Sequence, residues 1–341
     1  MTSLELEERY SRQVLFPGIG AEGQRKLAGA RIAIVGCGAT GSALASLLAR
    51  AGVGTIRIID RDYVEPGNLQ RQSLFDESDA AESLPKAIAA ARKIGAFNSQ
   101  IVVEPHVADL IPTNVDSLLA GIDLILDGTD NFETRYLIND YAVKFSRPWI
   151  YAAAVGSYCA TLNIVPGRTA CLACIFPEPP RGPSETCETA GILNSLVNVA
   201  ASLAATEALK FLTGASGQLR QTLLWFDLWR NERAEVLADH PRADCRACGG
   251  RHFIHLAGEG RAHITLCGRN SVQIHEQRRP LNLAQMTERL KPHGTVRHND
   301  FVLKFWQGPY EMTLFPDGRA IIKGTMDTAV ARSLYARYVG S

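Results

Sequence analysis

The sequence has almost no net charge and lacks several motifs that assign chains to common classes. Among 341 residues, 36 are basic and 35 acidic, a formal net charge of +1. No bulk field therefore draws the chain to nucleic acid or to an anionic membrane. Gly-x-Ser-x-Gly and His-Glu-x-x-His are both absent, so serine hydrolase and zincin chemistry have no support. Repeats and low-complexity tracts are absent too, which leaves a globular protein that recognises any charged partner locally.

Long uninterrupted apolar runs are also missing. The first twelve positions contain no apolar core of the kind that a secretory signal needs. The most apolar later segment, 192–212, carries two asparagines, a glutamate and a lysine, which favours a buried helix over a membrane span. We therefore expect a cytoplasmic protein. Eight cysteines in a reducing compartment favour metal binding over disulfides.

Short β-rich segments alternate with helical ones along most of the chain. The expected strands are 31–35, 55–59, 101–107, 124–126 and 149–153, and the expected helices are 42–51, 86–95, 113–119 and 132–145. Two helices, 4–15 and 20–27, precede them. This alternation predicts an α/β fold with a Rossmann-like, doubly wound sheet and N-terminal helices. Segments 157–165 and 221–229 are typical of antiparallel strands, so we expect a mixed sheet.

A segment rich in charge, cysteine and glycine, 239–251, indicates a joint between domains. We expect one domain over residues 1–250 and a second over 251–341. In the second, strands are expected at 272–275, 296–297, 301–306, 310–315 and 319–322, with helices at 283–290 and 328–338. This pattern predicts a small α+β domain.

A glycine motif, Gly36-x-Gly38-x-x-Gly41, lies between the first expected strand of the sheet and the next helix. Its glycines allow a tight turn, close approach of backbone N–H groups to phosphate, and close packing of helix on strand. Asp60 ends the next strand, where an acidic side chain can hold ribose hydroxyls. The motif predicts a nucleotide site and, alone, is most typical of dinucleotide oxidoreductases.

Two Cys-x-x-Cys pairs, Cys171/Cys174 and Cys245/Cys248, have the spacing of a tetrahedral structural zinc site. Each pair lies beside turn-forming residues, so we expect zinc to clamp the end of the sheet to the following segment. The alternatives are four unrelated thiols or a redox pair, and the occurrence of two pairs together disfavours both.

Further motifs occur in order along the chain: Arg9-Tyr-Ser-Arg12-Gln13, Asn68-Leu-Gln-Arg-Gln72 and Gly128-Thr-Asp130-Asn131. Together with the glycine motif and the cysteine pairs, which extend the match over residues 9–248, they resemble the ThiF/MoeB family of sulfur-carrier adenylyltransferases, relatives of ubiquitin-activating enzymes. The resemblance implies a homodimer that uses ATP and Mg²⁺ to adenylate the C-terminal Gly-Gly carboxylate of a ubiquitin-like sulfur-carrier protein of ThiS or MoaD type. The pathway would be thiamin thiazole synthesis, molybdopterin synthesis or a related sulfur transfer, with a cysteine desulfurase or rhodanese as a further partner.

The resemblance also implies roles for individual residues. Asp60 would bind the ribose, Asn68, Arg71 and Lys86 the phosphates, and Asp130 with Asn131 the Mg-nucleotide, while Arg12 would enter from the second subunit. The full set expected to bind nucleotide is Gly36, Gly38, Ala39, Gly41, Asp60, Asp62, Asn68, Leu69, Gln70, Arg71, Gln72, Lys86, Asp130 and Asn131; the expected catalytic residues are Arg12, Arg71, Lys86, Asp130 and Cys187. An anionic carboxylate must approach an anionic triphosphate, so the reaction needs fixed cations and a magnesium-holding acid. Taken singly, each charged residue could instead form a surface salt bridge.

The other cysteines are open to more than one interpretation. Cys187 follows a proline-rich stretch, and its resemblance to the family implies either a sulfur-handling or acyl-linking thiol or a non-essential loop thiol. Cys37 is expected to pack rather than react, and Cys159 to lie in the core. Cys267 is expected in the core or as a second sulfur-relay thiol. The C-terminal domain shows no rhodanese signature, so we expect no built-in persulfide donor.

Two rival functions stay open. An NAD-dependent oxidoreductase could use the same glycine motif. A non-catalytic protein-binding scaffold could retain the nucleotide fold, although Arg71, Lys86 and Asp130 count against it because a scaffold needs no triphosphate cradle.

Overall fold

The structure, a computed structural model, describes residues 3–178, 190–258, 265–266, 271–274 and 280–340. It divides into two compact units, one of residues 1–81 and 86–259 and the other of residues 82–85 and 260–341. The first unit extends beyond the boundary expected after residue 250. Arg251 donates to the carbonyl of Val143, and the backbone N–H of His255 to Asp140, which holds this segment to the first unit.

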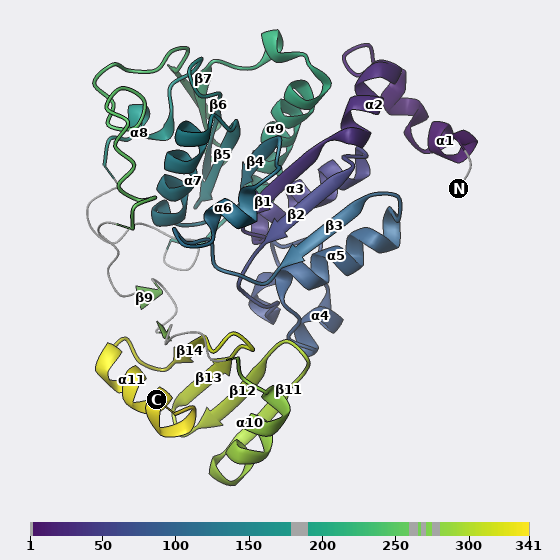
Figure 1. Cartoon of the computed structure of the whole chain (residues 1–341). Helices are drawn as coiled ribbons and strands as arrows, with labels where there is room; N and C mark the ends of the chain where they lie inside the picture. Colours follow the sequence, from purple (N-terminus) through teal and green to yellow (C-terminus); the bar gives the residue numbers. More distant parts are fainter. Residues whose placement is uncertain (1–2, 179–189, 259–264, 267–270, 275–279, 341) are drawn as a thin grey trace. The chain divides into compact units, whose positions relative to one another are not determined.

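The first unit contains an eight-stranded mixed sheet of order β3-β2-β1-β4-β5-β6-β7-β8 (Figure 1). Strands β3, β2, β1, β4 and β5 are parallel, and β6, β7 and β8 continue the sheet in antiparallel fashion. Their bounds are β1 Arg31–Val35, β2 Thr55–Ile59, β3 Val102–His106, β4 Leu124–Asp127, β5 Trp149–Val155, β6 Tyr158–Ile164, β7 Thr222–Asp227 and β8 Glu232–Leu237. The prediction of a mixed, Rossmann-like sheet is confirmed.

The register of the central strands positions the candidate site. Val35, the last residue of β1, pairs with Ile59 of β2 and with Asp127 of β4. Parallel strands that end in register release their following residues at one edge of the sheet. The glycine motif, Asp60 and the loop that follows Asp127 therefore meet at this edge.

Helices cover both faces of the sheet. Those of the first unit are α1 Ser3–Val14, α2 Gly20–Gly29, α3 Ala39–Arg50, α4 Glu77–Ala81, α5 Lys86–Phe97, α6 Val115–Leu119, α7 Phe132–Phe145, α8 Leu172–Ile175 and α9 Asn194–Thr213, with short 3-10 turns η1 Pro66–Asn68 and η2 Ser216–Gln218. Helix α3 packs against α5 and α9, whereas α6 and α7 lie on the other face (Figure 1). Right-handed crossovers give this arrangement. The chain runs from β1 outward to β3 and then returns to β4 on the other side of β1, so the later helices lie on the opposite face.

Helix α9 is, among the described residues, the one helix long and apolar enough to cross a membrane by length and composition. Half of its most apolar window is buried. It packs against α3 and β5, and its buried Glu207 accepts a hydrogen bond from Asn163 at 2.6 Å. These contacts agree with the predicted buried helix.

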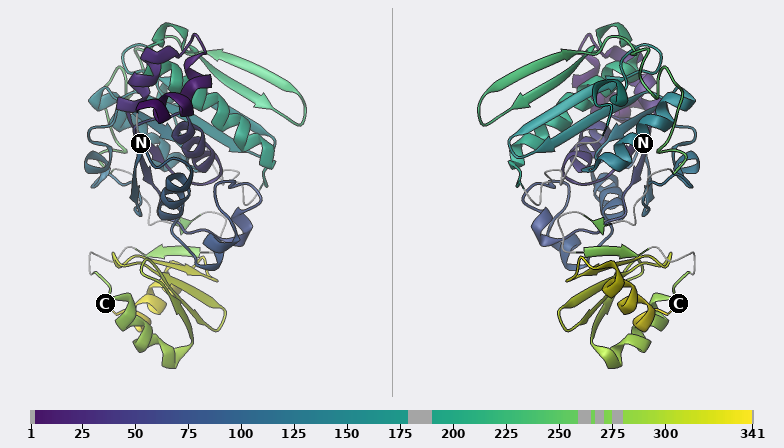
Figure 2. Two further views of the ribbon diagram at one scale, coloured as in Figure 1. Left: turned by 90° about the vertical axis from the view of Figure 1, so that its right-hand side faces the viewer. Right: turned by 90° about the vertical axis from the view of Figure 1, so that its left-hand side faces the viewer.

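The β7–β8 hairpin projects from the edge of the sheet (Figure 2). Strand β7 ends at Asp227, before the expected end, because the Asp227 carboxylate accepts the N–H groups of Trp229 and Arg230 in the turn. Strand β8, which the sequence did not predict, is exposed along its whole length.

The second unit is an α+β domain around a six-stranded antiparallel sheet of order β11-β12-β13-β14-β10-β9. Its elements are β9 Thr265–Leu266, β10 Ser271–Ile274, α10 Leu283–Leu290, η3 Lys291–His293, β11 Thr295–His298, β12 Leu303–Gln307, β13 Tyr310–Leu314, β14 Ala320–Lys323 and α11 Thr328–Tyr338. Phe305, Met312 and Ile322 share a core with Leu290 and Tyr335 of the helices. One face of this sheet is therefore packed against α10 and α11.

Candidate active site and metal centre

The glycine loop after β1 packs directly against the loop after β4. Gly36 has φ +84°, and a Cβ placed there would lie 2.7 Å from the carbonyl oxygen of Gly128. A Cβ on Gly41 would lie 1.9 Å from the oxygen of Gly36, and one on Gly128 2.3 Å from the same atom. These distances are far inside van der Waals contact, so glycine is required at all three positions. Beside Gly38, by contrast, the nearest atom to such a Cβ is 3.9 Å away, which leaves room for a ligand.

Asp60 holds the glycine loop to the end of β2. One carboxylate oxygen accepts the backbone N–H of Cys37 at 2.6 Å and the other that of Asp62 at 2.7 Å. Burial raises the pKa of Asp60, and the charge of Lys86 partly offsets this rise. The carboxylate thus orders the loop, and its expected contact with the ribose stays a prediction.

Lys86 begins α5 and is buried beside the same loop. Its Nζ lies 3.1 Å from the Asp62 carboxylate, and its backbone N–H donates to the Asp62 carbonyl at 2.8 Å. Only 3% of Lys86 is exposed, so its charge is desolvated and its field is strong at short range. The structure therefore brings the predicted Lys86 and Asp62 together.

Arg61 is a site residue that sequence reasoning missed. It lies between Asp60 and Asp62 and forms an ion pair with Asp109 at 2.9 Å. Burial alone would lower the pKa of Arg61, but the carboxylates of Asp109, Asp62, Asp130 and Asp60 together raise it. Arg61 is thus one more fixed cation within electrostatic reach of Asp130.

The loop after β4 is anchored by a buried ion pair. Asp127 is fully buried, and one of its oxygens accepts both the N–H and the hydroxyl of Thr129, at 2.8 and 2.7 Å. The other oxygen accepts Nε–H of Arg135 at 2.9 Å. Asp130 is exposed at the end of this loop, and Asn131 caps α7 by accepting the N–H of Thr134. Asn131 therefore has a structural role besides the predicted one.

The predicted phosphate-binding segment begins at the last residue of η1. Asn68 is buried and accepts the N–H of Glu65 at 3.1 Å, while Arg71 donates to the carbonyl of Gly67 at 2.9 Å.

Gln72 is 3% exposed, and its Oε1 has no hydrogen-bond partner in the described part of the chain. Its Nε2 is the atom nearest to the open space beside Gly38. An unpaired buried amide facing such a space is consistent with a polar ligand there. Among the other predicted contacts, Leu69 is half-buried, Gln70 exposed, and Ala39 begins α3.

Arg12 lies in the last turn of α1 and is exposed to solvent. Its expected role concerns the site of a second subunit, so that role stays a prediction.

The four cysteines of the two pairs form one cluster. The Sγ atoms of Cys171, Cys174, Cys245 and Cys248 lie within 4.8 Å of one another, and the closest pairs are 3.7 to 3.8 Å apart. Tetrahedral ligands at a typical zinc–sulfur distance of about 2.3 Å would be about 3.8 Å apart. The backbone N–H of Arg242 points at the sulfur of Cys174 at 3.4 Å. The four sulfur atoms therefore have the spacing of ligands to one metal ion.

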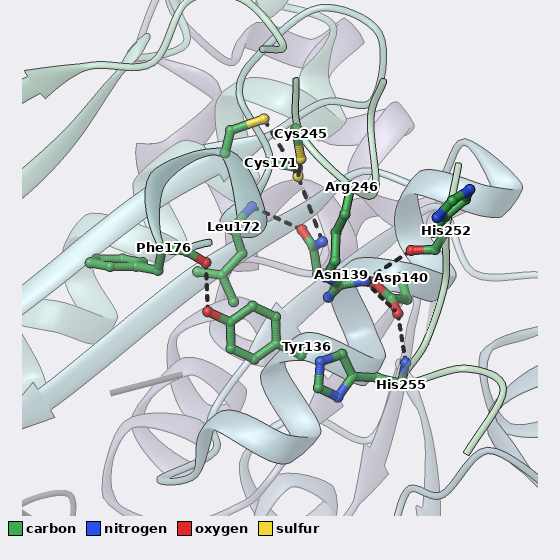
Figure 3. A network of polar contacts seen from close by, with 11 residues as sticks. Tyr136, Asn139, Asp140, Cys171, Leu172, Phe176, Cys245, Arg246, His252 and His255 are labelled. Atoms are coloured by element: carbon green, nitrogen blue, oxygen red, sulfur yellow. Dashed lines mark hydrogen bonds and ion pairs between the residues drawn. The ribbon is translucent and has the colours of Figure 1, made fainter. Parts of the chain in front are cut away.

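Helix α7 supports this cluster through Asn139. Its Nδ2 donates to Cys171 Sγ at 3.6 Å, and its Oδ1 accepts the N–H of Leu172 at 2.8 Å (Figure 3). Hydrogen bonds of this kind fix the orientation of metal ligands. The start of α8 is thus positioned by a side chain that the sequence motifs did not reveal.

Arg246, between the second pair of cysteines, connects the cluster to the same helix (Figure 3). Its Nη1 lies 3.0 Å from Asp140 and donates to the carbonyl of His252 at 3.0 Å. The ring of Tyr136 stacks on His255 with centroids 5.0 Å apart. Burial, with the nearby charge of Arg246, lowers the pKa of His255 to about 4, so the ring is neutral at pH 7.

The remaining described cysteines are core residues, as predicted. Cys37 and Cys159 are both buried. Burial raises the pKa of Cys37, and it raises that of Cys159 to about 11, so both stay as thiols at neutral pH. Cys187 and Cys267 lie outside the described residues, and their predicted roles stay predictions.

Known proteins are similar to this chain. Over residues 10–247 the sequence matches the ThiF family. The chain belongs to the ThiF family. The sulfur carrier protein ThiS adenylyltransferase of Bacillus subtilis is 44% identical over 336 residues, which cover 97% of this chain and 99% of that protein. The sulfur carrier protein adenylyltransferase of Thermus thermophilus is 37% identical, over 71% of this chain and 90% of its own.

Other proteins match 71% of the chain. The adenylyltransferase and sulfurtransferase MOCS3 of Sus scrofa is 38% identical over 71% of this chain, which spans 53% of that relative. A crystal structure of MccB of E. coli with ATP superposes with a TM-score of 0.62 at 26% identity, covering 71% of this chain and 74% of that one. The fold is therefore shared with a structure solved with ATP.

Proposed function

We propose that this protein adenylates the C-terminal carboxylate of a ubiquitin-like sulfur carrier of ThiS type, using Mg-ATP and releasing pyrophosphate. One observation carries the proposal: the register of β1, β2 and β4 brings the glycine loop, Asp60 and the Asp130 loop to one edge of the sheet. The choice of a ThiS-type carrier, and hence of thiamin thiazole synthesis, is supported by a relative of that name that aligns along nearly the whole chain.

The reaction joins two anions, and the site residues suit that problem. A carboxylate oxygen must attack the α-phosphate while pyrophosphate leaves, so catalysis consists largely of positioning and charge neutralisation. Lys86, Arg71 and Arg61 supply fixed positive charge near the loops, and in our proposal Arg12 of a second subunit adds another. In this scheme Asp60 holds the ribose.

The two metals have separate roles in this proposal. Mg²⁺ would be held by Asp130 together with phosphate oxygens, and it would neutralise charge that develops on the leaving pyrophosphate. Zn²⁺ would be held by the four cysteines, all supplied by the protein, which is typical of a structural site without an open position for substrate. The sulfur–sulfur distances support this second assignment.

The carrier would reach the nucleotide with a Gly-Gly tail. A tail without side chains fits a narrow passage to the α-phosphate. A persulfide of a donor such as a cysteine desulfurase or rhodanese would then attack the carbonyl carbon of the adenylate and displace AMP. A second thiol, for which Cys187 is a candidate, would cleave the resulting acyl disulfide to the thiocarboxylate and would itself end in a disulfide with the donor. ATP and reduced cysteines are both compatible with the cytoplasm, where we place the reaction.

Intact-mass spectrometry of the carrier tests the proposal. The purified protein is incubated with Mg-ATP and each Gly-Gly carrier of its host, and the carrier is examined for the mass increase of an acyl-adenylate, the mixed anhydride with AMP. A ThiS-type carrier should form the adenylate, and a carrier that lacks the last glycine should not. Absence of the adenylate on every such carrier would refute the proposed activity.

A further inference from the structure

The guanidinium of Arg135, from α7, bonds both to β5 and to the end of β4 with the loop that follows it. Its Nε donates to Asp127 at 2.9 Å, and its Nη2 donates to the carbonyl of Thr129 at 2.6 Å and, at 3.3 Å, to that of Ala152 in β5. Arg135 is 5% exposed and Asp127 is fully buried. The guanidinium carbon also lies 5.2 Å from the ring centre of Tyr151.

We propose that Arg135 is a positioning residue that, together with Asp127, holds the loop 128–130 so that Asp130 is presented to the Mg-nucleotide. This inference rests on the proposed function, since it assigns Asp130 to the metal. Arg135 itself does not touch substrate in this scheme. It acts through Thr129, whose N–H, hydroxyl and carbonyl are all bound by the pair.

The cost of burying two charges argues for a positional role. Taking a carboxylate and a guanidinium out of water is expensive, and apolar residues of similar volume often stabilise a core as well or better. A buried pair is therefore weak support for stability alone. The planar fork of Arg135 binds a carboxylate and backbone carbonyls at the same time, which fixes the loop in direction as well as in place.

Substituting lysine for Arg135 tests the geometry of the guanidinium separately from its charge. Arg135→Lys keeps the charge but has no fork, so it cannot make the contacts to Asp127, Thr129 and Ala152 together. The matched control is Arg57→Lys: Arg57 also pairs with a carboxylate, Glu104 at 2.7 Å, and donates to backbone carbonyls, those of Leu118 and Ala120. Arg57 lies within β2, however, and makes no contact with the loop 128–130 that the structure records.

Titration calorimetry with ATP, in the presence and absence of Mg²⁺, measures the effect without relying on activity. We expect Arg135→Lys to weaken binding of Mg-ATP about tenfold, the lower end of the effect of losing a supporting residue at a metal site. Binding of ATP without Mg²⁺ should change less than about twofold, and Arg57→Lys should bind both like the wild type. Equal Mg-ATP affinity in Arg135→Lys and wild type would overturn the inference. So would an equal loss with and without Mg²⁺, since that would indicate a merely structural role.

A second pair of variants decides the matter if Arg135→Lys fails to fold. Thr129→Val removes the hydroxyl that donates to Asp127, and Thr129→Ser retains it. We expect weaker Mg-ATP binding for the valine variant than for the serine variant, and identical affinities would refute the role of the pair. Failure of this inference can be distinguished from failure of the proposed function. If Arg135→Lys loses affinity only for Mg-ATP and no carrier is adenylated by the wild type, the positioning role stands and the proposed function is refuted. If the wild type adenylates the carrier and Arg135→Lys binds Mg-ATP normally, the proposed function stands and the positioning role is refuted.

Discussion

Three aspartates at the carboxyl edge of the sheet differ in what their oxygens bind. Asp60 accepts two backbone N–H groups, and Asp127 binds Thr129 and Arg135. Both are buried, with their oxygens engaged in holding loops. Asp130 is exposed beside them, so of the three we expect it to coordinate a cation brought by a nucleotide.

Asp130→Ala should therefore abolish activity without unfolding the protein. Carrier-dependent ATP–pyrophosphate exchange should fall at least about 100-fold, because the charge that holds the metal is lost at an exposed position. Asp123→Ala, at the opposite end of β4, is the control and should exchange normally, with circular dichroism of both variants like that of the wild type. Normal exchange in Asp130→Ala would disprove its catalytic role.

The residues at motif positions made part of this site predictable from the sequence. The residues around them did not make the rest of it predictable. The glycines and Asp60 could be placed from spacing, because a phosphate-binding loop constrains the local sequence, whereas Lys86 was assigned only through the resemblance to the family. Arg61 and Arg135 could not, because their roles depend on Asp109 and on Ala152 of β5, which only the folded sheet brings near. An Arg flanked by two aspartates after a strand is the only local signal that Arg61 offered.

At the scale of an element, two glycines of the same loop, Gly41 and Gly38, are expected to respond differently to substitution by alanine. Gly41→Ala would force a Cβ onto the Gly36 carbonyl, 1.9 Å away, so we expect a loss of about 2 kcal/mol in the free energy of unfolding. That loss corresponds to a melting temperature roughly 4–8 °C lower for a domain of this size. Gly38→Ala meets no close atom, so its melting temperature should match that of the wild type while its affinity for ATP falls. Calorimetric melting and ATP titration of the two variants check this, and equal ATP affinity in Gly38→Ala and wild type would mean that the nucleotide does not approach this position.

Several elements were predicted with their observed limits, among them β1, α7, α10 and α11. Strand β8 was missed for a physical reason. It is an edge strand with every side chain exposed, so no alternation of buried and polar residues marks it. It exists because the turn at Asn231, with φ 57°, returns the chain alongside β7. Pairing, rather than intrinsic preference, creates this strand.

At the scale of the molecule, the cysteine cluster joins segments that lie far apart in the sequence. Cys171 and Cys245 are 74 positions apart, and a cross-link that closes a loop of this length is expected to contribute about 4 kcal/mol. We expect chelation to lower the melting temperature by roughly 10 °C and zinc to restore it. Mg²⁺ is added to both the chelated and the zinc-restored sample, so that removal of magnesium does not account for the difference between them. Folded protein purified without chelators should contain one zinc ion per chain, and its absence would contradict a structural zinc site.

If the protein is a homodimer as proposed, two inactive variants should restore activity when their subunits are mixed, which monomers could not do. If Arg12 completes the site of its partner, Arg12→Ala and Asp130→Ala dimers should each be inactive, because every site in them has one defect. After subunit exchange about half of the dimers are mixed, and in each of these one site combines an intact Asp130 with an intact Arg12. Pyrophosphate exchange should then recover to about a quarter of the wild-type level. If Arg12 served its own subunit, both sites of a mixed dimer would stay defective, so no recovery after exchange verified by native mass spectrometry would rule out the contribution across the interface.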